Sequence, residues 1–271
     1  MTHIQKDEVS NSVPVGVTVS VYMLAYMHEK YIQRAVESVL AQKTDFSYEI
    51  CIGEDESSDR TREICKELAA KYPDRIRLFL RSREDVIWIS GKPTGRGNAI
   101  LTRAACRGRY IAICEGDDCW IDEYKLQKQY DYMENNPDCS ICGTLGIERT
   151  EMSSAPDVIK PLHGSAIYKH SWFLSGKTGM LTASLFWRAD CVKAEVMDDP
   201  NIMVGDWALL LSITERGMRC VILPFISVVY RKHAGGAWSG AKIDSKYRFE
   251  MRRRAFQQYL KHAPVEDHKT L

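Results

Sequence analysis

Two patterns of hydrophobic and polar positions alternate along the first 145 residues. Short apolar or alternating runs are typical of strands, and the segments between them repeat their apolar positions at the spacing of one helical face. The segment 90–97 is rich in Gly, Pro, Ser and Thr, which predicts a loop. The predicted strands are 17–23, 48–52, 76–80, 110–114 and 140–145, and the predicted helices are 29–42, 59–72, 98–106 and 124–135.

This alternation predicts crossover connections and therefore an α/β fold with a Rossmann-like, mostly parallel sheet flanked by helices. Ligands of such sheets bind beyond the carboxyl ends of the strands. The chain after residue 148 is less regular, with one predicted helix at 207–215 and strands at 220–223 and 226–230. The expected division is a flexible N-terminal arm (1–14), a single domain (15–240, with halves 15–147 and 148–240), and a basic helix with a tail (241–271).

Composition and charge exclude several classes of function. Lys and Arg (37) nearly balance Asp and Glu (36), whereas a general nucleic-acid-binding protein would carry a clear basic excess. The nine cysteines are scattered, which favours buried free thiols, and Cys139 and Cys142 have no second pair that would suggest a zinc site. The polar residues 1–11 do not resemble a secretion signal, so we expect a cytoplasmic protein.

Acidic residues cluster at the ends of two predicted strands. Glu54-Asp55-Glu56 follows the second strand, and Glu115-Gly116-Asp117-Asp118 follows the fourth. Carboxylates gathered at a ligand site repel one another unless a cation neutralises them, and a divalent cation that bridges phosphates is the usual solution. Capping of helix N-termini is the alternative role for such acids. It suits Asp59 and Asp122, which lie at the starts of two helical runs.

Six sequence elements follow one another in a fixed order. They are Val19-Ser20-Val21 and Tyr26 with the helix after them, the segment 53–61, Asn98, Glu115 to Asp118, Gly205-Asp206-Trp207, and Tyr230-Arg231-Lys232-His233. With these elements, residues 17–239 resemble the family 2 glycosyltransferases, which have the GT-A fold. Leu24, Met27 and Glu115 depart from the family pattern, and only Glu115, in place of an Asp, touches the chemistry.

The resemblance implies an inverting transfer of a sugar from a nucleotide-diphosphate donor to an acceptor hydroxyl, with Mn²⁺ or Mg²⁺ as cofactor. Asp117 matches the metal ligand of the family, and His233 matches a histidine that reaches the metal or diphosphate in some members. Imidazole suits Mn²⁺ better than Mg²⁺. A structural role remains the alternative for His233. Asp206 matches the general base, and an additional role as a helix cap is compatible with it.

The remaining implied contacts concern the donor. Asp55 matches the residue that faces the pyrimidine, and a carboxylate can accept the uracil N3–H, which cytosine lacks, so a UDP-sugar is favoured. Stabilisation of a turn is the alternative role for Asp55. Glu115 matches the ribose contact. The other donor-binding positions implied by the resemblance are Ala25, Tyr26, Asn98, Gly116 and Arg231.

Two other functions compete with this interpretation. A sugar-1-phosphate nucleotidyltransferase would be expected to carry a glycine-rich loop near the first strand, and residues 17–31 contain no glycine. A non-catalytic sugar-nucleotide-binding module would be expected to lack Asp206.

The acceptor is expected to be a carbohydrate or a glycolipid of bacterial surface polysaccharide or glycoconjugate synthesis, recognised by residues 148–185. The basic segment 242–261 predicts a peripheral contact with the inner face of the membrane or with a partner. Packing of this helix on the domain is the alternative.

Overall fold

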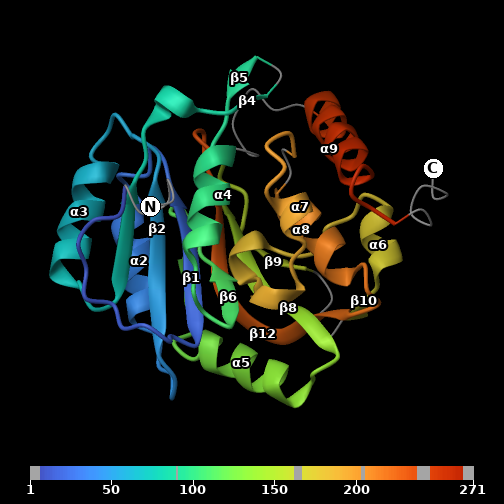
Figure 1. Ribbon diagram of the computed structural model, residues 1–271, viewed down its shortest axis with the longest axis horizontal. Coiled ribbons are helices and arrows are strands. Elements are labelled where there is room, and N and C mark those ends of the chain that lie inside the picture. Colours follow the sequence, from blue (N-terminus) through green and yellow to red (C-terminus); the bar gives the residue numbers. More distant parts are fainter. Residues whose placement is uncertain (1–6, 90, 162–166, 203–204, 237–244, 265–271) are drawn as a thin grey trace.

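The computed structural model describes residues 7–89, 91–161, 167–202, 205–236 and 245–264 (Figure 1). Its first half alternates strands and helices as the sequence predicts, and β1, β2, β3 and β6 lie parallel. The elements are β1 (Val19–Ala25), α2 (Ile32–Leu40), β2 (Tyr48–Glu54), α3 (Thr61–Lys71), β3 (Ile76–Leu80), α4 (Arg96–Ala105), β6 (Tyr110–Ile113), α5 (Lys125–Asn135) and β8 (Cys139–Thr150).

The main sheet has the strand order β10-β12-β8-β11-β6-β1-β2-β3. Its longest pairings are parallel, as expected, but β11 (Phe186–Arg188) lies antiparallel between β6 and β8. The sequence pattern did not predict this three-residue strand, whose Phe186 and Trp187 are buried. The other short strands of this sheet are β7 (Cys119–Trp120), β9 (Val158–Lys160) and β10 (Ile167–Tyr168). A separate hairpin pairs β4 (Trp88–Ile89), just before the expected loop 90–97, with β5 (Lys92–Pro93) inside it.

The two strands predicted at 220–223 and 226–230 are one strand, β12 (Arg219–Lys232), so that expectation was wrong. Its pairing with β8 shifts register between Leu223 and Ile226, on either side of Pro224. Proline has no N–H for the ladder, and a shift of register is how a strand accommodates it. Since β12 runs parallel to β8, its carboxyl end lies at the same edge of the sheet as those of β1, β2 and β6.

Helices cover both faces of the sheet, because alternate strand residues point to opposite sides. On one face, α2, α3 and α5 pack against β1 residues such as Val21 and Met23. On the other, α8 (Gly205–Thr214) packs over Tyr22 and Ile111, and α9 (Ser245–Tyr259) packs on α8. The shorter helices are α6 (His170–Leu174), α7 (Ala194–Met197) and the 3-10 turns η1 (Arg83–Asp85), η2 (Thr182–Ser184) and η3 (Ala189–Cys191).

Residues 7–13, which we expected in a flexible arm, are attached to β3. The Val9 N–H donates to Leu78 O at 2.8 Å, and Glu8 pairs with Arg77. These contacts extend the sheet beyond β3, which explains why a polar segment is fixed there. The boundary expected at 240/241 lies outside the described residues.

Two further expectations concern the cysteines and the acidic residues Asp59 and Asp122. All nine cysteines are free, and Cys139 and Cys142 are buried in β8. Asp59 and Asp122 accept N–H bonds from Thr61 and Tyr124, but neither is the helix cap that we expected, because the N-cap residues of α3 and α5 are Arg60 and Tyr124. None of the helices in the described segments combines the length and apolar character that crossing a bilayer would need.

Candidate active site

The two acidic clusters meet at the carboxyl end of β1. The Asp55 N–H donates to Ala25 O at 3.0 Å, and the Gly116 N–H donates to Leu24 O at 3.0 Å. The loops after β2 and β6 therefore flank the loop after β1, as expected for neighbouring parallel strands.

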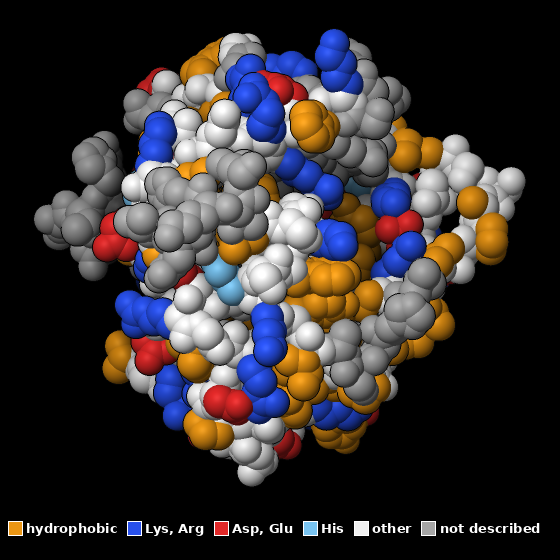
Figure 2. Space-filling model, turned by 90° about the vertical axis from the view of Figure 1, so that its right-hand side faces the viewer, with side chains coloured by type: hydrophobic (Ala, Val, Ile, Leu, Met, Phe, Trp, Pro, Cys, Tyr) orange, Lys and Arg blue, Asp and Glu red, His pale blue; other side chains and the backbone are white. Residues whose placement is uncertain are grey.

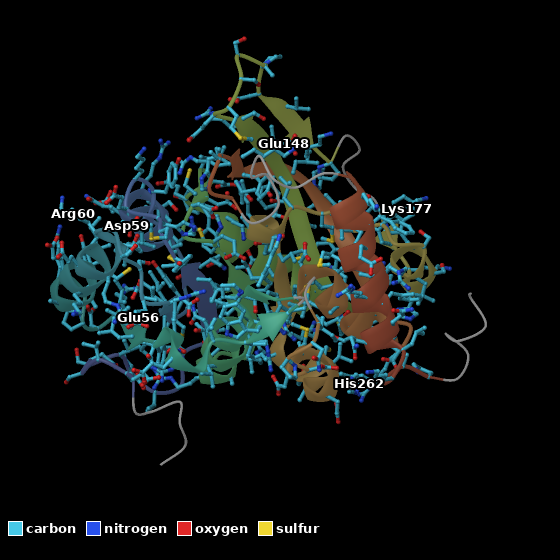
Figure 3. The ribbon with its side chains drawn as sticks, turned by 90° about the horizontal axis from the view of Figure 1, so that it is seen from above. Glu56, Asp59, Arg60, Glu148, Lys177 and His262 are labelled. Atoms are coloured by element: carbon cyan, nitrogen blue, oxygen red, sulfur yellow. The ribbon has the colours of Figure 1, made fainter. Side chains whose placement is uncertain are left out.

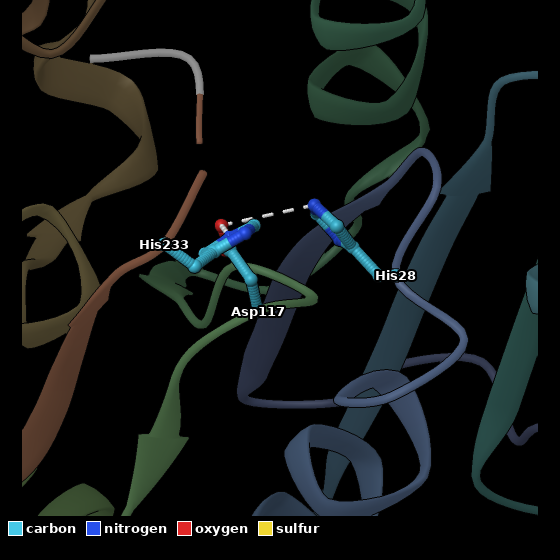
Figure 4. Close-up of side chains that lie close together, drawn as sticks. All are labelled: His28, Asp117 and His233. Carbon is cyan, nitrogen blue, oxygen red and sulfur yellow. Dashed lines mark hydrogen bonds and ion pairs between the residues drawn. The ribbon is translucent and has the colours of Figure 1, made fainter. Parts of the chain in front are cut away.

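The residue that follows β12 also lies at this edge of the sheet, next to Asp117. His233, just beyond β12, has its Nε2 3.0 Å from Asp117 Oδ2, and His28 Nε2 in the loop after β1 lies 3.7 Å from the same oxygen (Figure 4). The three candidate ligand atoms all lie within 4.8 Å of one another. Sequence reasoning named Asp117 and His233 but missed His28. Its place directly after the first strand, where the fold gathers ligand-binding residues, was the available signal.

The two histidines keep Asp117 ionised. Burial acts to raise the pKa of Asp117, but the hydrogen bond with His233 and the nearby His28 outweigh burial and hold this pKa below its usual value. A site with two imidazole nitrogens and one carboxylate oxygen suits a first-row divalent metal such as Mn²⁺. The residues present thus fit a divalent cation.

Arg231 fastens β12 to the turn that carries Asp117. Its N–H donates to Asp118 Oδ1 at 2.8 Å, and its guanidinium donates to Asp117 O at 3.0 Å. The Arg231 side chain is buried against the Tyr31 ring, 5.3 Å from the ring centroid. These contacts join the end of β12 to the turn that carries Asp117.

Asp206 comes from the second half of the chain, in the first turn of α8. Its Oδ1 accepts the Trp207 N–H at 2.8 Å, and its Oδ2 accepts the Thr182 hydroxyl at 3.2 Å. Burial raises the pKa of Asp206 above its usual value. Burial also raises the pKa of Glu115 to about 8, with Asp117 and Asp206 adding to the shift. Asp206 therefore lies close enough to the acidic turn for their charges to interact.

A buried carboxylate and an arginine form a separate corner of the site. Asp55 is 5% exposed and forms an ion pair with Arg83, whose guanidinium lies 4.5 Å from the centroid of the half-exposed Tyr26 ring. Burial raises the pKa of Asp55 to about 6, against the opposing effect of Arg83. Sequence reasoning missed Arg83, because nothing in the sequence around this single loop arginine indicates that its partner is Asp55.

Asn98 lies beside the end of β2, and both groups of its side-chain amide form hydrogen bonds within the protein. The side chain donates to Gly53 O at 2.8 Å and accepts from the Thr102 hydroxyl at 2.9 Å. A Cβ at Gly53 would lie 2.2 Å from the Asn98 oxygen, so this glycine permits the close approach of α4 to β2. Asn98 thus fixes the strand that leads into Asp55.

Two proteins of known sequence are similar to most of this chain. An uncharacterised protein of Mycobacterium tuberculosis is 32% identical over 238 residues, covering 86% of this chain, and the chain spans 64% of that relative's length. The E. coli UDP-Glc:alpha-D-GlcNAc-diphosphoundecaprenol beta-1,3-glucosyltransferase WfaP is 27% identical over 80% of this chain and 78% of its own.

The S. aureus TarS 1-349 structure in complex with UDP-GlcNAc has the same fold, which confirms the expected GT-A architecture. It has a TM-score of 0.62 at 15% identity and covers 93% of this chain and 69% of its own. The family described as Glycosyl transferase family 2 matches residues 20–191, which is more than half of the chain. The chain therefore belongs to glycosyl transferase family 2.

Proposed function

We propose that the protein transfers a sugar from a UDP-sugar to an acceptor hydroxyl with inversion of the anomeric centre. The observation that carries the proposal is the cluster of Asp117, His28 and His233, whose candidate ligand atoms lie within 4.8 Å of one another. The charge of Asp206, on α8, acts on Glu115 of the same acidic turn. A carboxylate base opposite a cation-binding site is what a single displacement needs, since no covalent nucleophile takes part.

Residues 15–147 bind the donor in this proposal. Asp55 accepts the uracil N3–H, Arg83 and Tyr26 line the base, and Glu115 contacts the ribose. Ala25 and Gly116 line the site through their backbone, and Asn98 acts indirectly by fixing the end of β2. A uridine nucleotide also occurs in the names of the E. coli relative and of the S. aureus complex.

Asp117 and His233 would hold Mn²⁺ or Mg²⁺, which when bound would act as a Lewis acid on the departing diphosphate. Asp206 takes the proton of the acceptor hydroxyl as its oxygen forms the bond to the anomeric carbon and the bond to the diphosphate breaks. The Thr182 hydroxyl and the Trp207 N–H orient this carboxylate. Arg231 supports the metal-binding turn and adds positive charge near the leaving group.

Residues 148–240 bind the acceptor in the proposal, and the E. coli relative suggests its class. That protein is named for a lipid-linked diphosphate acceptor. A glycolipid acceptor would place this chain at the cytoplasmic face of the membrane, in surface polysaccharide or glycoconjugate synthesis. The competing function is a non-catalytic module that binds sugar nucleotides without using Asp206.

The purified protein is expected to hydrolyse UDP-sugars slowly in the presence of Mn²⁺, and to bind UDP at least about tenfold more tightly than CDP. The reason is that CDP would leave the buried Asp55 without its N3–H partner, a loss of about 1.5–3 kcal/mol for a charged acceptor. Calorimetric titration of UDP, CDP and GDP, with a matched hydrolysis assay, measures both. Tighter binding of CDP or GDP would refute the uracil contact, and UDP binding without turnover of any sugar nucleotide would favour the non-catalytic module.

We also propose that the outer face of α9 contacts an anionic membrane surface. Met251, Ala255 and Tyr259 are buried, so this helix packs on the domain, while Phe249 is 69% exposed. Arg253 and Arg254 are exposed and pair with Glu250 of the same helix, whereas the charge of the exposed Arg252 acts on the buried Asp206. Figure 2 looks onto this side of the molecule, and in its described part Lys and Arg side chains are more widespread than acidic ones.

Charge reversal of Arg253 and Arg254 to Glu is expected to weaken binding to anionic vesicles by about 30-fold, from about 1 kcal/mol per basic residue. Sedimentation with phosphatidylglycerol vesicles at low salt measures it, and 0.5 M salt should abolish the wild-type binding. Reversal of the exposed Lys66 and Lys71 on α3 is the matched control. Equal binding of both variants and the wild type to the vesicles would refute the proposal that α9 contacts the membrane.

A further inference from the structure

The loop after β1 is held in an unusual conformation. Met27 has φ 58°, a left-handed value that is uncommon for a residue with a side chain. The backbone N–H groups of the three successive residues 27–29 each donate to a side chain in the loop between β2 and α3 or at the first residue of α3. The acceptors are Ser57 Oγ at 2.9 Å, Thr61 Oγ1 at 2.7 Å and Asp59 Oδ2 at 3.2 Å. Strained conformations persist only where their surroundings fix them, and they cluster at functional sites.

This conformation directs the His28 side chain into the site. The side chain is 16% exposed, and its Nε2 lies 3.7 Å from Asp117 Oδ2, which is too long for a hydrogen bond. Its Nδ1 is buried and has no hydrogen-bond partner in the part of the chain that the structure describes. A Cβ at residue 116 would lie 2.7 Å from this Nδ1, so Gly116 leaves the room that the imidazole occupies. The protein thus buries a polar ring that its own contacts do not satisfy.

We infer that His28 is a third protein ligand of the divalent cation, bound through Nε2 alongside Asp117 and His233. The inference rests on the proposed function, which assigns the cation to the other two residues. Ligands about 2.1 Å from one ion lie roughly 3 Å apart when adjacent and roughly 4.2 Å apart when opposite. The observed separations of 3.0 and 3.7 Å, and the limit of 4.8 Å for the set, fall close to that range.

A third ligand of this kind would make the site selective between Mn²⁺ and Mg²⁺. Mg²⁺ prefers oxygen ligands and keeps several waters, so it gains little from a second imidazole. Mn²⁺ accepts imidazole more readily. With His28 as a ligand, the site discriminates for Mn²⁺ and against Mg²⁺, and its remaining coordination positions stay available for diphosphate oxygens of the donor.

The first test titrates Mn²⁺ and Mg²⁺ separately, without nucleotide, into the wild type and the His28→Gln variant. The variant is expected to bind Mn²⁺ about 10–100-fold more weakly, a loss typical even of residues that only support metal ligands. Mg²⁺ affinity should change by a few-fold at most. If His28 merely positioned Asp117, both ions would weaken alike, and that result would overturn the inference.

His262→Gln is the matched control. His262 pairs with Asp199 beside α9, and Figure 3 shows it on the opposite side of the molecule from Asp59, whose carboxylate holds the loop of His28. This variant should bind both ions as the wild type does. A His28→Ala variant, with thermal unfolding measured for each protein, distinguishes loss of a ligand from loss of fold.

The second test counts the imidazoles on Mn²⁺ by pulsed electron paramagnetic resonance, with ¹⁵N-labelled histidine to assign the coupled nitrogens. Two imidazoles are expected in the wild type and one in His28→Gln. One imidazole in the wild type, lost in His233→Gln and retained in His28→Gln, would overturn the inference and leave the proposed function intact. Failure of the wild type to bind Mn²⁺ at all would refute both the inference and the metal role in the proposed function.

Discussion

Asp206→Asn is expected to lower sugar transfer by about 10²–10⁴-fold, the usual cost of losing a general base. The acceptor hydroxyl must lose its proton as its bond to the anomeric carbon forms, and an amide cannot take that proton. The raised pKa of Asp206, caused by burial, makes this carboxylate a stronger base than an exposed one. Initial rates with an identified acceptor measure the loss, and donor hydrolysis serves as a surrogate.

Binding of UDP to the same variant should stay near the wild-type affinity, because the proposed donor contacts come from the first half of the chain. Asp190→Asn is the matched control, since Asp190 is an exposed acid of the second half. Near-normal transfer by a folded Asp206→Asn variant would mean that another residue is the general base. Glu195, Asp198 and Asp199 would be the next candidates, although Asp198 pairs with Arg103 and Asp199 with His262.

The convergence of the acidic clusters was predictable because it depends on local pattern and one general rule. Apolar runs marked β1, β2 and β6, and parallel strands bring their carboxyl ends to one edge of the sheet. Asp55 directly follows β2, and Asp117 follows β6 after three residues, so their sequence positions place both residues at this edge.

The rest of the site depends on contacts between distant segments. His28 lies beside Asp117 in a loop whose residues 27–29 are held by side chains between β2 and the start of α3. The pairing of Arg83 with Asp55 joins two loops. The merging of two predicted strands into β12 follows from its pairing with β8, since Pro224 read alone indicates a break. The periodicity of apolar positions indicates whether a segment forms a helix or a strand. It carries little information about which distant segment that helix or strand will contact.

Asp117→Asn is expected to weaken UDP binding in the presence of Mn²⁺ by at least about 10–100-fold, the cost of losing residues that merely support metal ligands. The pKa of Asp117 lies below its usual value, so at neutral pH the wild-type side chain carries the negative charge that attracts the cation. Asparagine keeps the shape and removes this charge. In the wild type, UDP alone brings more negative charge to a site in which Asp117 is already ionised, so binding without the cation meets repulsion.

Calorimetric titration of UDP with Mn²⁺, and again with a chelator, measures this effect. The wild type should lose affinity when the chelator is added, whereas Asp117→Asn should bind weakly in both conditions. Asp131→Asn, at an exposed position of α5, should behave as the wild type. Wild-type affinity in Asp117→Asn, together with insensitivity of both proteins to the chelator, would mean that the donor binds without a metal. The two histidines beside Asp117 would then have to act on the diphosphate directly.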